Sequence, residues 1–515
     1  MHAILTVVAL AALPSVAFAQ QQTDQEYQDT QVEPKAGKTT TRVGFETEVH
    51  SYNNLDFRPL DESSDQVILD SDDRGQFAFS GINLALAYRA APDMTLNFAA
   101  SHRGLWGNDQ TGSVNRFGGF MYVTGMSLDW KPGAKDRADE GVTVRIGRQY
   151  YELGGIGGSP DFILSDVLDG IRVDFPLGEI GRVEALPYML LSSTGDNINA
   201  NFSSYIGQSA IQTYSFRGDT ITQRSGGQVV LDGLVDNVDL RAHAFYTDIG
   251  AMGTGADISY NGDLGNFADN DWVANLGARG QYSAGSLVAW GEFDASMGVD
   301  RKELVAQDVD TFGMAYGAGA RLDTGKLSAT ASYFDAWGPG YTADGMQYSH
   351  GYVSMKGRQA GGLLANRYLG WHPTAYVGTF GVDTSSHDRD RKSGTRTIHA
   401  GVSYSAKAVR VAAAAWMFQD TGVTLLKISE LDTLNPPYGY SRAEFAAEQR
   451  LGRTLGQEVD LTVTYNANDV LSFFGEAGAF LPGAFYSINV DRSAGNQLGG
   501  QSMAWAADIG TRVQF

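Results

Sequence analysis

The sequence predicts an all-β fold: a transmembrane antiparallel β-barrel of about 18 strands, with long extracellular loops and short periplasmic turns. Apolar and polar residues alternate with a period of two through most of the chain. The 515 residues include 63 Gly and no Cys, and 11% of them are aromatic. After the N-terminal segment, no apolar stretch approaches the roughly 20 residues of a membrane-spanning helix. In a barrel, by contrast, only every second residue has to face lipid.

The N-terminus is typical of an exported protein. An apolar core from Ala3 to Val16 precedes Ala17-Phe18-Ala19, a small-x-small cleavage site. A short buried helix is the structural alternative for this segment. The residues that follow are rich in Gln, Asp and Glu, which is typical of a disordered segment. We therefore expect a signal peptide at 1–19, a disordered periplasmic tail at 20–41 and an outer-membrane barrel at 42–515.

The alternation is clearest near the C-terminus. In Glu458–Tyr465, the side chains of Val459, Leu461, Val463 and Tyr465 share one face, and those of Glu458, Asp460, Thr462 and Thr464 share the other. The last segment, Asp508–Phe515, alternates in the same way and ends on an aromatic residue. We expect it to close the barrel against the first strand, with Phe515 at the periplasmic interface. Such an ending also resembles the signal that outer-membrane proteins present to the barrel-assembly machinery.

Twenty segments alternate in this way, and an even strand number is the rule for bacterial barrels. We expect 18 of them to be strands, because 42–52 and 351–357 alternate least clearly. The candidates are 42–52, 76–90, 94–104, 117–130, 141–150, 169–176, 181–191, 226–235, 238–246, 272–283, 285–294, 311–323, 325–337, 351–357, 374–383, 395–405, 409–417, 458–465, 471–481 and 503–515.

The links between these segments alternate between short and long. Short links lie at 91–93, 177–180, 236, 284, 324 and 406, and long links at 53–75, 192–225, 249–271, 419–455 and 481–501. Short periplasmic turns and long outer loops are the usual asymmetry of an outer-membrane barrel. With the C-terminus in the periplasm, the long links fall on the outer side.

A formal net charge of −21 excludes nucleic acid as a partner, because phosphate binding needs a basic surface. The acidic surface serves solubility, or it forms outer loops that divalent cations bridge to anionic lipid and lipopolysaccharide. We expect no cofactor, no metal site and no enzyme activity. The segment Asp70–Gly75 begins like a calcium loop but has Arg74 at the third ligand position. No nucleophile motif is present.

Charged residues on the strands are expected to point into the lumen, because the other face must be apolar. The inward set contains Arg103, Arg145, Arg172, Arg182, Arg241, Arg279, Arg321, Arg410 and Arg512, together with Asp174, Glu184, Asp239, Asp323, Glu458, Asp460, Glu476 and Asp508. Two interpretations stay open. The charges form paired ladders that stiffen the wall, or the arginines form a selectivity site, since a guanidinium binds carboxylates in bidentate fashion.

Two stretches resemble a known family. Val144–Gly155 reads V-R-I-G-R-Q-Y-Y-E-L-G-G and is followed by L-D-G-I-R-V-D-F at Leu168–Phe175. Near the C-terminus, L-G-Q-E-V-D-L-T-V-T-Y precedes G-A-F-L-P-G-A-F-Y at Gly478–Tyr486. These elements are similar to those of the alginate-export family of outer-membrane porins.

The resemblance implies an 18-stranded barrel whose lumen passes an anionic uronate polymer. Carried over, Arg145 or Arg148 and Arg172 are pore cations, and Asp169, Glu458 and Asp460 are their acidic neighbours. Arg145 and Arg148 fall on opposite faces unless Gly147 forms a bulge, and the alternation favours Arg145 as the inward one. A long periplasmic turn that plugs some family members is not expected here, because the link at 466–469 is short.

The expected function is passive, selective passage of a hydrophilic anionic solute, with a uronate-type saccharide or polysaccharide as the expected class. A general or small-nutrient porin is the alternative within the same class. An outer-membrane binding or adhesion protein acting through acidic loops is the alternative from another class. The direction of transport stays open, because a pore has none of its own.

Overall fold

The structure is a computed structural model of the chain. It describes residues 37–54, 74–106, 120–133, 141–153, 163–191, 222–249, 271–300, 309–338, 340–341, 347–349, 351–355, 361–365, 375–376, 394–421, 454–484 and 502–515. The expected signal peptide and most of the expected tail lie outside these residues.

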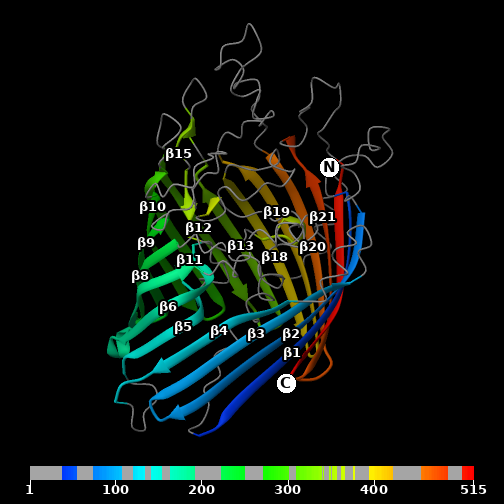
Figure 1. Cartoon of the computed structure of the whole chain (residues 1–515). Helices are drawn as coiled ribbons and strands as arrows, with labels where there is room; N and C mark the ends of the chain where they lie inside the picture. The colour runs from blue at the N-terminus through cyan, green and yellow to red at the C-terminus, as the bar shows by residue number, and fades with distance from the viewer. Residues whose placement is uncertain are drawn as a thin grey trace.

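Eighteen antiparallel strands form one closed ring (Figure 1). In chain order they are β1 (Thr39–Asn53), β2 (Arg74–Ala91), β3 (Met94–Trp106), β4 (Phe120–Trp130), β5 (Thr143–Glu152), β6 (Ser165–Pro176), β7 (Arg182–Leu191), β8 (Thr222–Val235), β9 (Val238–Ile249), β10 (Asp271–Ala284), β11 (Leu287–Asp300), β12 (Val309–Asp323), β13 (Leu327–Ala336), β18 (Thr395–Ala406), β19 (Val409–Asp420), β20 (Thr454–Asn466), β21 (Leu471–Pro482) and β22 (Ala504–Gln514).

The first and last strands close the ring. β1 pairs with β22 from Gly44↔Gln514 to Asn53↔Trp505. At the periplasmic end, Val43 and Phe515 exchange backbone hydrogen bonds of 3.2 and 2.9 Å. The expected closure by the C-terminal strand is therefore confirmed. Closure leaves no sheet edge at this junction. In lipid such an edge would be unfavourable, because its backbone groups would have no water to bind.

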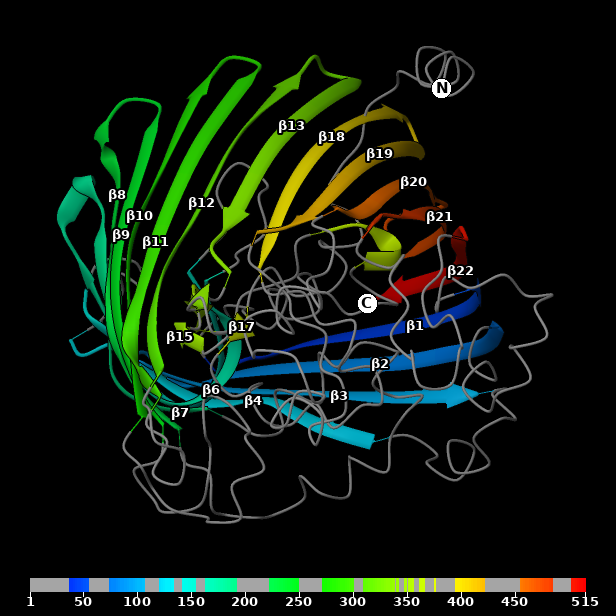
Figure 2. The same ribbon diagram turned by 90° about the horizontal axis from the view of Figure 1, so that it is seen from above.

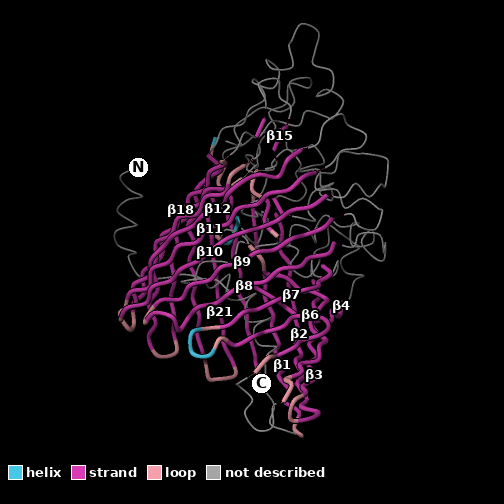
Figure 3. Tube along the Cα trace, turned by 90° about the vertical axis from the view of Figure 1, so that its left-hand side faces the viewer, coloured by secondary structure: helices cyan, strands magenta, loops and turns pink. Residues whose placement is uncertain are grey.

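The period-two alternation separates a lipid-facing surface from a polar lumen. On β20, Val459 and Leu461 point outward and are 56% and 49% exposed, whereas Glu458, the residue before Val459, is fully buried on the inner face. The strands tilt across the long axis of the molecule (Figure 3). A closed sheet with an apolar exterior and a charged interior is the architecture of outer membranes. The chain is thus an integral outer-membrane protein.

Hairpin turns mark one end of the barrel. The links at 236–237 and 407–408 each contain two residues. Asn237 in the first link has a φ of 64°, and Lys407 in the second has a φ of 52°. These left-handed conformations fit the tight turns that match the twist of paired strands. The C-terminus lies at this end (Figure 1), which we assign to the periplasm. The expected alternation of short and long links is confirmed.

Two strand assignments were wrong: 42–52 was excluded from the expected strands, and 374–383 was included. The segment at 42–52 is a full strand, β1, and its first residue, Thr39, lies three positions before the expected tail boundary at 42. The segment at 374–383 does not belong to the wall. Within the described residues it contributes only β17 (Ala375–Tyr376), which pairs with β16 (Val353–Ser354). The count of 18 is correct because these two errors offset one another.

The link between β13 and β18 enters the ring. It contains β14 (Gly340–Tyr341), β15 (Gln347–Ser349), β16 and β17, and seen from above the outline of the wall encloses β15 and β17 (Figure 2). The turn before β7 holds a short 3-10 helix, η4 (Gly178–Ile180). No helix in the described ranges is long and apolar enough to cross a membrane.

The closing junction contains one fully buried histidine. His50 on β1 lies 2.9 Å from Asp508 of β22 through Nδ1 and 2.9 Å from Glu48 through Nε2. All three side chains point into the lumen side of the wall and are almost inaccessible to solvent. The imidazole therefore separates two carboxylates that would otherwise repel each other.

His50→Ala is expected to lower the free energy of unfolding by about 3 kcal/mol, because two buried carboxylates lose the group that bridges them. Urea unfolding of the refolded protein in lipid vesicles measures this change. The double variant His50→Ala/Asp508→Asn should recover part of the loss, since it removes one of the two charges. Equal stability of the single variant and the native chain would contradict a role for His50 in closure.

Candidate functional site

The candidate site is the part of the lumen that the β13–β18 link occupies. Two short segments of this link are described in contact with the wall: 351–355 and 361–365. The first contacts β8, β10, β11 and β12, and the second contacts β20 and the Trp416 ring of β19. Two strands, β13 and β18, stand between β12 and β19 in the ring. The link therefore reaches two separated parts of the wall and narrows the lumen.

The first contact is polar and buried. The Tyr352 hydroxyl donates to Asp294 of β11 at 2.5 Å. The backbone N–H of Val353 donates to Ser296 Oγ at 3.0 Å, and the carbonyl of Val353 accepts from Asn275 Nδ2 at 3.0 Å. Arg224 of β8 donates to the Met355 carbonyl at 2.8 Å. Backbone N–H and C=O groups of the link thus form hydrogen bonds to wall side chains in place of water. These bonds stabilise the contact, because an unpaired polar group is costly in a buried site.

Asp294 is the central acceptor of this contact. Besides Tyr352, its carboxylate accepts from Asn275 at 2.9 Å and lies 2.7 Å from His243 Nε2 of β9. Asp294 is fully buried and His243 nearly so. Hydrogen bonds to an ionised acceptor are the strong ones, so this carboxylate joins three wall strands and the link.

The second contact uses carboxylates of β20. Glu458 accepts the backbone N–H groups of Leu364 and Ala365 at 2.5 and 3.0 Å. Asp460 accepts from Leu363 N at 3.3 Å and from Trp416 Nε1 at 3.0 Å. A carboxylate facing the free N–H groups of a helical turn is a favourable arrangement, because those groups have no partner within the turn.

A glycine allows this close approach. Gly361 has φ of 105°, and a Cβ there would lie 2.2 Å from the Trp416 ring. The Trp416 indole in turn lies 4.0 Å from the His399 ring, measured between centroids. The second segment is therefore seated on an aromatic surface of β18 and β19.

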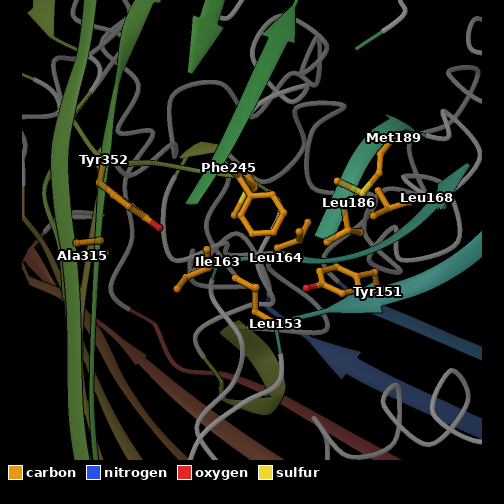
Figure 4. Close-up of a cluster of buried hydrophobic side chains, with 12 residues drawn as sticks. Tyr151, Leu153, Ile163, Leu164, Leu168, Leu186, Met189, Phe245, Ala315 and Tyr352 are labelled. Atoms are coloured by element: carbon orange, nitrogen blue, oxygen red, sulfur yellow. The ribbon is translucent and has the colours of Figure 1, made fainter. Parts of the chain in front are cut away.

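An apolar cluster joins the link to a second loop. Figure 4 shows Tyr352 and Phe245 near Leu153, Ile163 and Leu164, which flank the β5–β6 loop. The cluster also contains Tyr151, Leu168, Leu186, Met189, Ala315, Ala336 and Met355. Arg241 of β9 donates to the Leu153 carbonyl at 3.1 Å. Two loops are thus held together inside the barrel by buried apolar area, which favours association.

Eight inward arginines lie in the periplasmic half of the wall. Each lies within about five residues of the periplasmic end of its strand, where a turn or the C-terminus of the chain follows or precedes it. They are Arg145, Arg172, Arg182, Arg241, Arg279, Arg321, Arg410 and Arg512. Their strands, β5, β6, β7, β9, β10, β12, β19 and β22, are distributed around the ring, so the arginines form a belt at the periplasmic vestibule. The expected inward orientation of these side chains agrees with the observed register.

Carboxylates accompany most of this belt. Arg145 makes two hydrogen bonds to Asp129, of 2.6 and 2.8 Å. Arg172 lies 2.7 Å from Asp174 and over the Tyr151 ring, and Arg241 lies 2.7 Å from Asp239. Further pairs join Arg182 to Glu184, Arg279 to Glu292, Arg321 to Asp323 and Arg512 to Glu46. This geometry favours the interpretation of paired ladders that stiffen the wall.

Two pairs are more open to the lumen than the rest. The side chains of Arg182 and Arg321 are 42% and 37% exposed, compared with 16% for Arg145 and for Arg172. Exposed guanidinium groups keep donors that a passing solute can reach. Arg182 and Arg321 are thus better placed for contact with a solute than Arg145 and Arg172.

The wall from β20 to β1 is acidic. Glu458, Asp460, Glu476, Asp508 and Glu48 all face inward here, beside His50. Glu458 and Asp460 were expected to neighbour Arg145 and Arg172. The structure corrects this, because they lie on β20 and bind the link instead.

Three other expected site residues stand apart. Arg148 and Asp169 pair with each other on the outer face of β5 and β6, so they do not line the pore. Gly147 does not shift the register between these strands, which keeps Arg145 and Arg148 on opposite faces. Arg103 lies in β3, and its side chain is outside the described part of the structure.

Sequence reasoning missed the residues that hold the link. Asp294, Asn275 and Tyr352 were not singled out, because their roles depend on a loop that folds back into the ring. One signal was available: 351–357 alternates weakly and lies within a connection far longer than any turn. In the described ranges, no group of three or more His, Cys, Asp or Glu side chains is placed to hold a metal ion.

No family model and no curated protein matches the chain. Several solved structures are similar to it. OpdK, an outer membrane protein from Pseudomonas aeruginosa, has a TM-score of 0.49 and 7% identity over 94% of this chain and 100% of its own. OccK5 (OpdH) from P. aeruginosa has a TM-score of 0.47 and 10% identity, over 92% of this chain and 98% of its own. OccAB2 from Acinetobacter baumannii has a TM-score of 0.47 and 10% identity, over 93% of this chain and 98% of its own.

Each anchor of the link has its own expected signature in hydrogen exchange. Asp294→Ala should speed exchange of the amides at 352–355 by roughly fivefold, because about 1 kcal/mol per lost hydrogen bond corresponds to this factor. Glu458→Ala should act in the same way on the amides at 364 and 365. Mass-spectrometric exchange in detergent measures both effects.

Asp323→Ala, which removes an inward carboxylate at the periplasmic end, is the control and should change neither segment. Unchanged exchange at both segments in both anchor variants would contradict the assigned contacts.

Proposed function

We propose that the chain is a passive outer-membrane channel for hydrophilic solutes. One observation carries the proposal: a closed barrel has a charged lumen, and a loop fixed to two separated parts of the wall narrows it. A polar, charged interior is the usual arrangement of barrels that hold a water-filled channel. Solutes cross such a constriction by diffusion down their gradient.

The belt of arginines supports carboxylate-bearing solutes as the class that this channel prefers. A guanidinium offers a planar pair of donors that fits a carboxylate. Because most of these arginines have a carboxylate neighbour, each offers a weak and replaceable contact. Weak successive sites suit conduction, which needs release as much as binding. The resemblance to the alginate-export family makes a uronate-type saccharide the solute that we propose.

A general porin is the second candidate, and the acidic wall from β20 to β1 favours it. The inward carboxylates there have the opposite charge to the arginine belt. The electrostatic fields of the two groups therefore partly cancel for an ion in the lumen. Such a pore would pass small solutes with little regard to charge. Adhesion through acidic outer loops concerns residues outside the described part of the structure.

Conductance in a planar bilayer separates these functions. The refolded chain should form a steady open channel, and its reversal potential under a salt gradient should show anion preference. Replacing Arg182 and Arg321 by Gln should lower the anion-to-cation permeability ratio by about twofold per site. An interaction of ~0.4 kcal/mol, which is typical for exposed charges, produces this factor. Block by an oligouronate should weaken in parallel.

Arg396→Gln is the matched control, since Arg396 is 41% exposed but lies on the outer face of β18. It should leave selectivity unchanged. A steady conductance without ion preference or oligouronate block would replace the proposed solute by the general porin. Complete absence of conductance would reject both channel functions.

A further inference from the structure

The ion pair between Arg148 and Asp169 lies on the outside of the barrel. The register of β5 and β6 aligns Ile146 with Ile171 and Arg148 with Asp169. Ile146 is 47% exposed on the outer face, and Arg148, two residues further along, shares that face. Arg148 binds Asp169 in bidentate fashion, with distances of 2.9 and 2.7 Å. The outer surface therefore carries a charged pair among side chains that otherwise face lipid.

The height of this pair places it in the apolar layer. Arg148 is four residues above Val144, whose partner Trp130 is an exposed aromatic residue near the periplasmic end. Asp169 is six residues above the exposed Phe175 on β6. At about 3.3 Å per residue and a tilt of about 40°, the pair lies roughly 10–15 Å above these aromatic residues. The lipid-facing band of a barrel is about 25 Å tall, so this is mid-depth.

A second outward pair shows the usual position. Arg396 and Asp335 are 2.5 Å apart on the outer face of β18 and β13. Asp335 is eight residues above Leu327, the first residue of β13, and this corresponds to roughly 20 Å of height. Arg396 and Asp335 therefore reach the outer boundary of the lipid band, whereas Arg148 and Asp169 do not.

The wall is also incomplete beside Arg148. β4 and β5 share five residue pairs, from Met126↔Arg148 to Trp130↔Val144, fewer than any other junction of the ring. Within the described residues, β4 continues to Phe120 and β5 to Glu152 without pairing to each other. Arg148 Nη1 donates to the carbonyl of Val123 at 3.2 Å, at the point where the pairing ends. Sheet edges do not face lipid, because their backbone groups would have no partners.

We propose that the outer face of β4–β6 around Arg148 and Asp169 packs against a second copy of this chain in the membrane. A charged side chain facing lipid at mid-depth costs about 2–4 kcal/mol, and protein cover removes this cost. A lipid phosphate does not fit, because Asp169 balances the charge of Arg148. A second copy does fit: across a two-fold axis, Arg148 of each copy faces Asp169 of the other, so the patch is complementary to itself.

Charge substitutions test the interface in the full chain. Native mass spectrometry of protein extracted in mild detergent should show oligomers, and Arg148→Asp should lower the oligomeric fraction at least tenfold. The exchanged pair Arg148→Asp/Asp169→Arg should restore oligomers, because complementarity returns. Arg396→Asp, at the outward pair on the opposite side of the ring, should leave the oligomers intact. Oligomers that persist unchanged in Arg148→Asp would overturn the proposal.

A cross-link provides a readout that does not depend on charge variants. The chain contains no Cys, so Met126→Cys introduces a single thiol beside Arg148, at a position that is 65% exposed. A short bis-maleimide added to intact membranes should link copies of this variant. Ile398→Cys on β18, ten strands away in one direction around the ring and eight in the other, should give no link. A monomer in native spectra together with no link at position 126 would show that this face meets lipid or lipopolysaccharide, which also overturns the proposal.

Discussion

The whole structure depends on one constraint: in lipid, every backbone N–H and C=O group needs a partner within the protein. Eighteen strands meet it by closing on themselves, with β1 bonded to both β2 and β22. Closure fixes the register at the last junction, and the register decides which face each side chain takes. It therefore places apolar residues such as Val49 and Ile509 in lipid and Glu48, His50 and Asp508 in the interior. The polar lumen is a consequence of closure combined with alternation.

Inside the barrel the same rule applies to the link between β13 and β18. Its backbone groups leave bulk water, and wall side chains replace that water. Glu458 binds two consecutive N–H groups of the second segment, whereas Ser296, Asn275 and Arg224 bind backbone groups of the first. Asp294 adds a hydrogen bond to the Tyr352 hydroxyl. The acidic composition of the lumen is thus partly structural, because several inward carboxylates hold the loop. The eight arginines of the belt have a different distribution from these carboxylates: they lie in the periplasmic half, where most are paired with acids and some are partly open to water.

The sequence predicted the wall much better than the lumen. Period-two alternation is a local property, so it located nearly every strand and the inward arginines. It failed at 42–52, where Gly44 and polar residues weaken the pattern although β1 pairs on both sides. It also gave Arg148 a role in the pore, because a motif match does not determine which face a residue takes. Tyr352 contacts Asp294, and Glu458 contacts Leu364, because the link folds back into the ring. These partners lie tens of residues apart in the sequence, and a local alternation carries no information about such contacts.

We infer that the link, held by carboxylates on two parts of the wall, sets the narrowest width of the pore. Exclusion of neutral polymers of graded size, measured through their effect on single-channel current, tests this width most directly. In the double variant Asp294→Ala/Glu458→Ala, larger polymers should enter and the conductance should rise, because both anchors are released. The same size limit and the same conductance in the variant and in the native chain would contradict the claim.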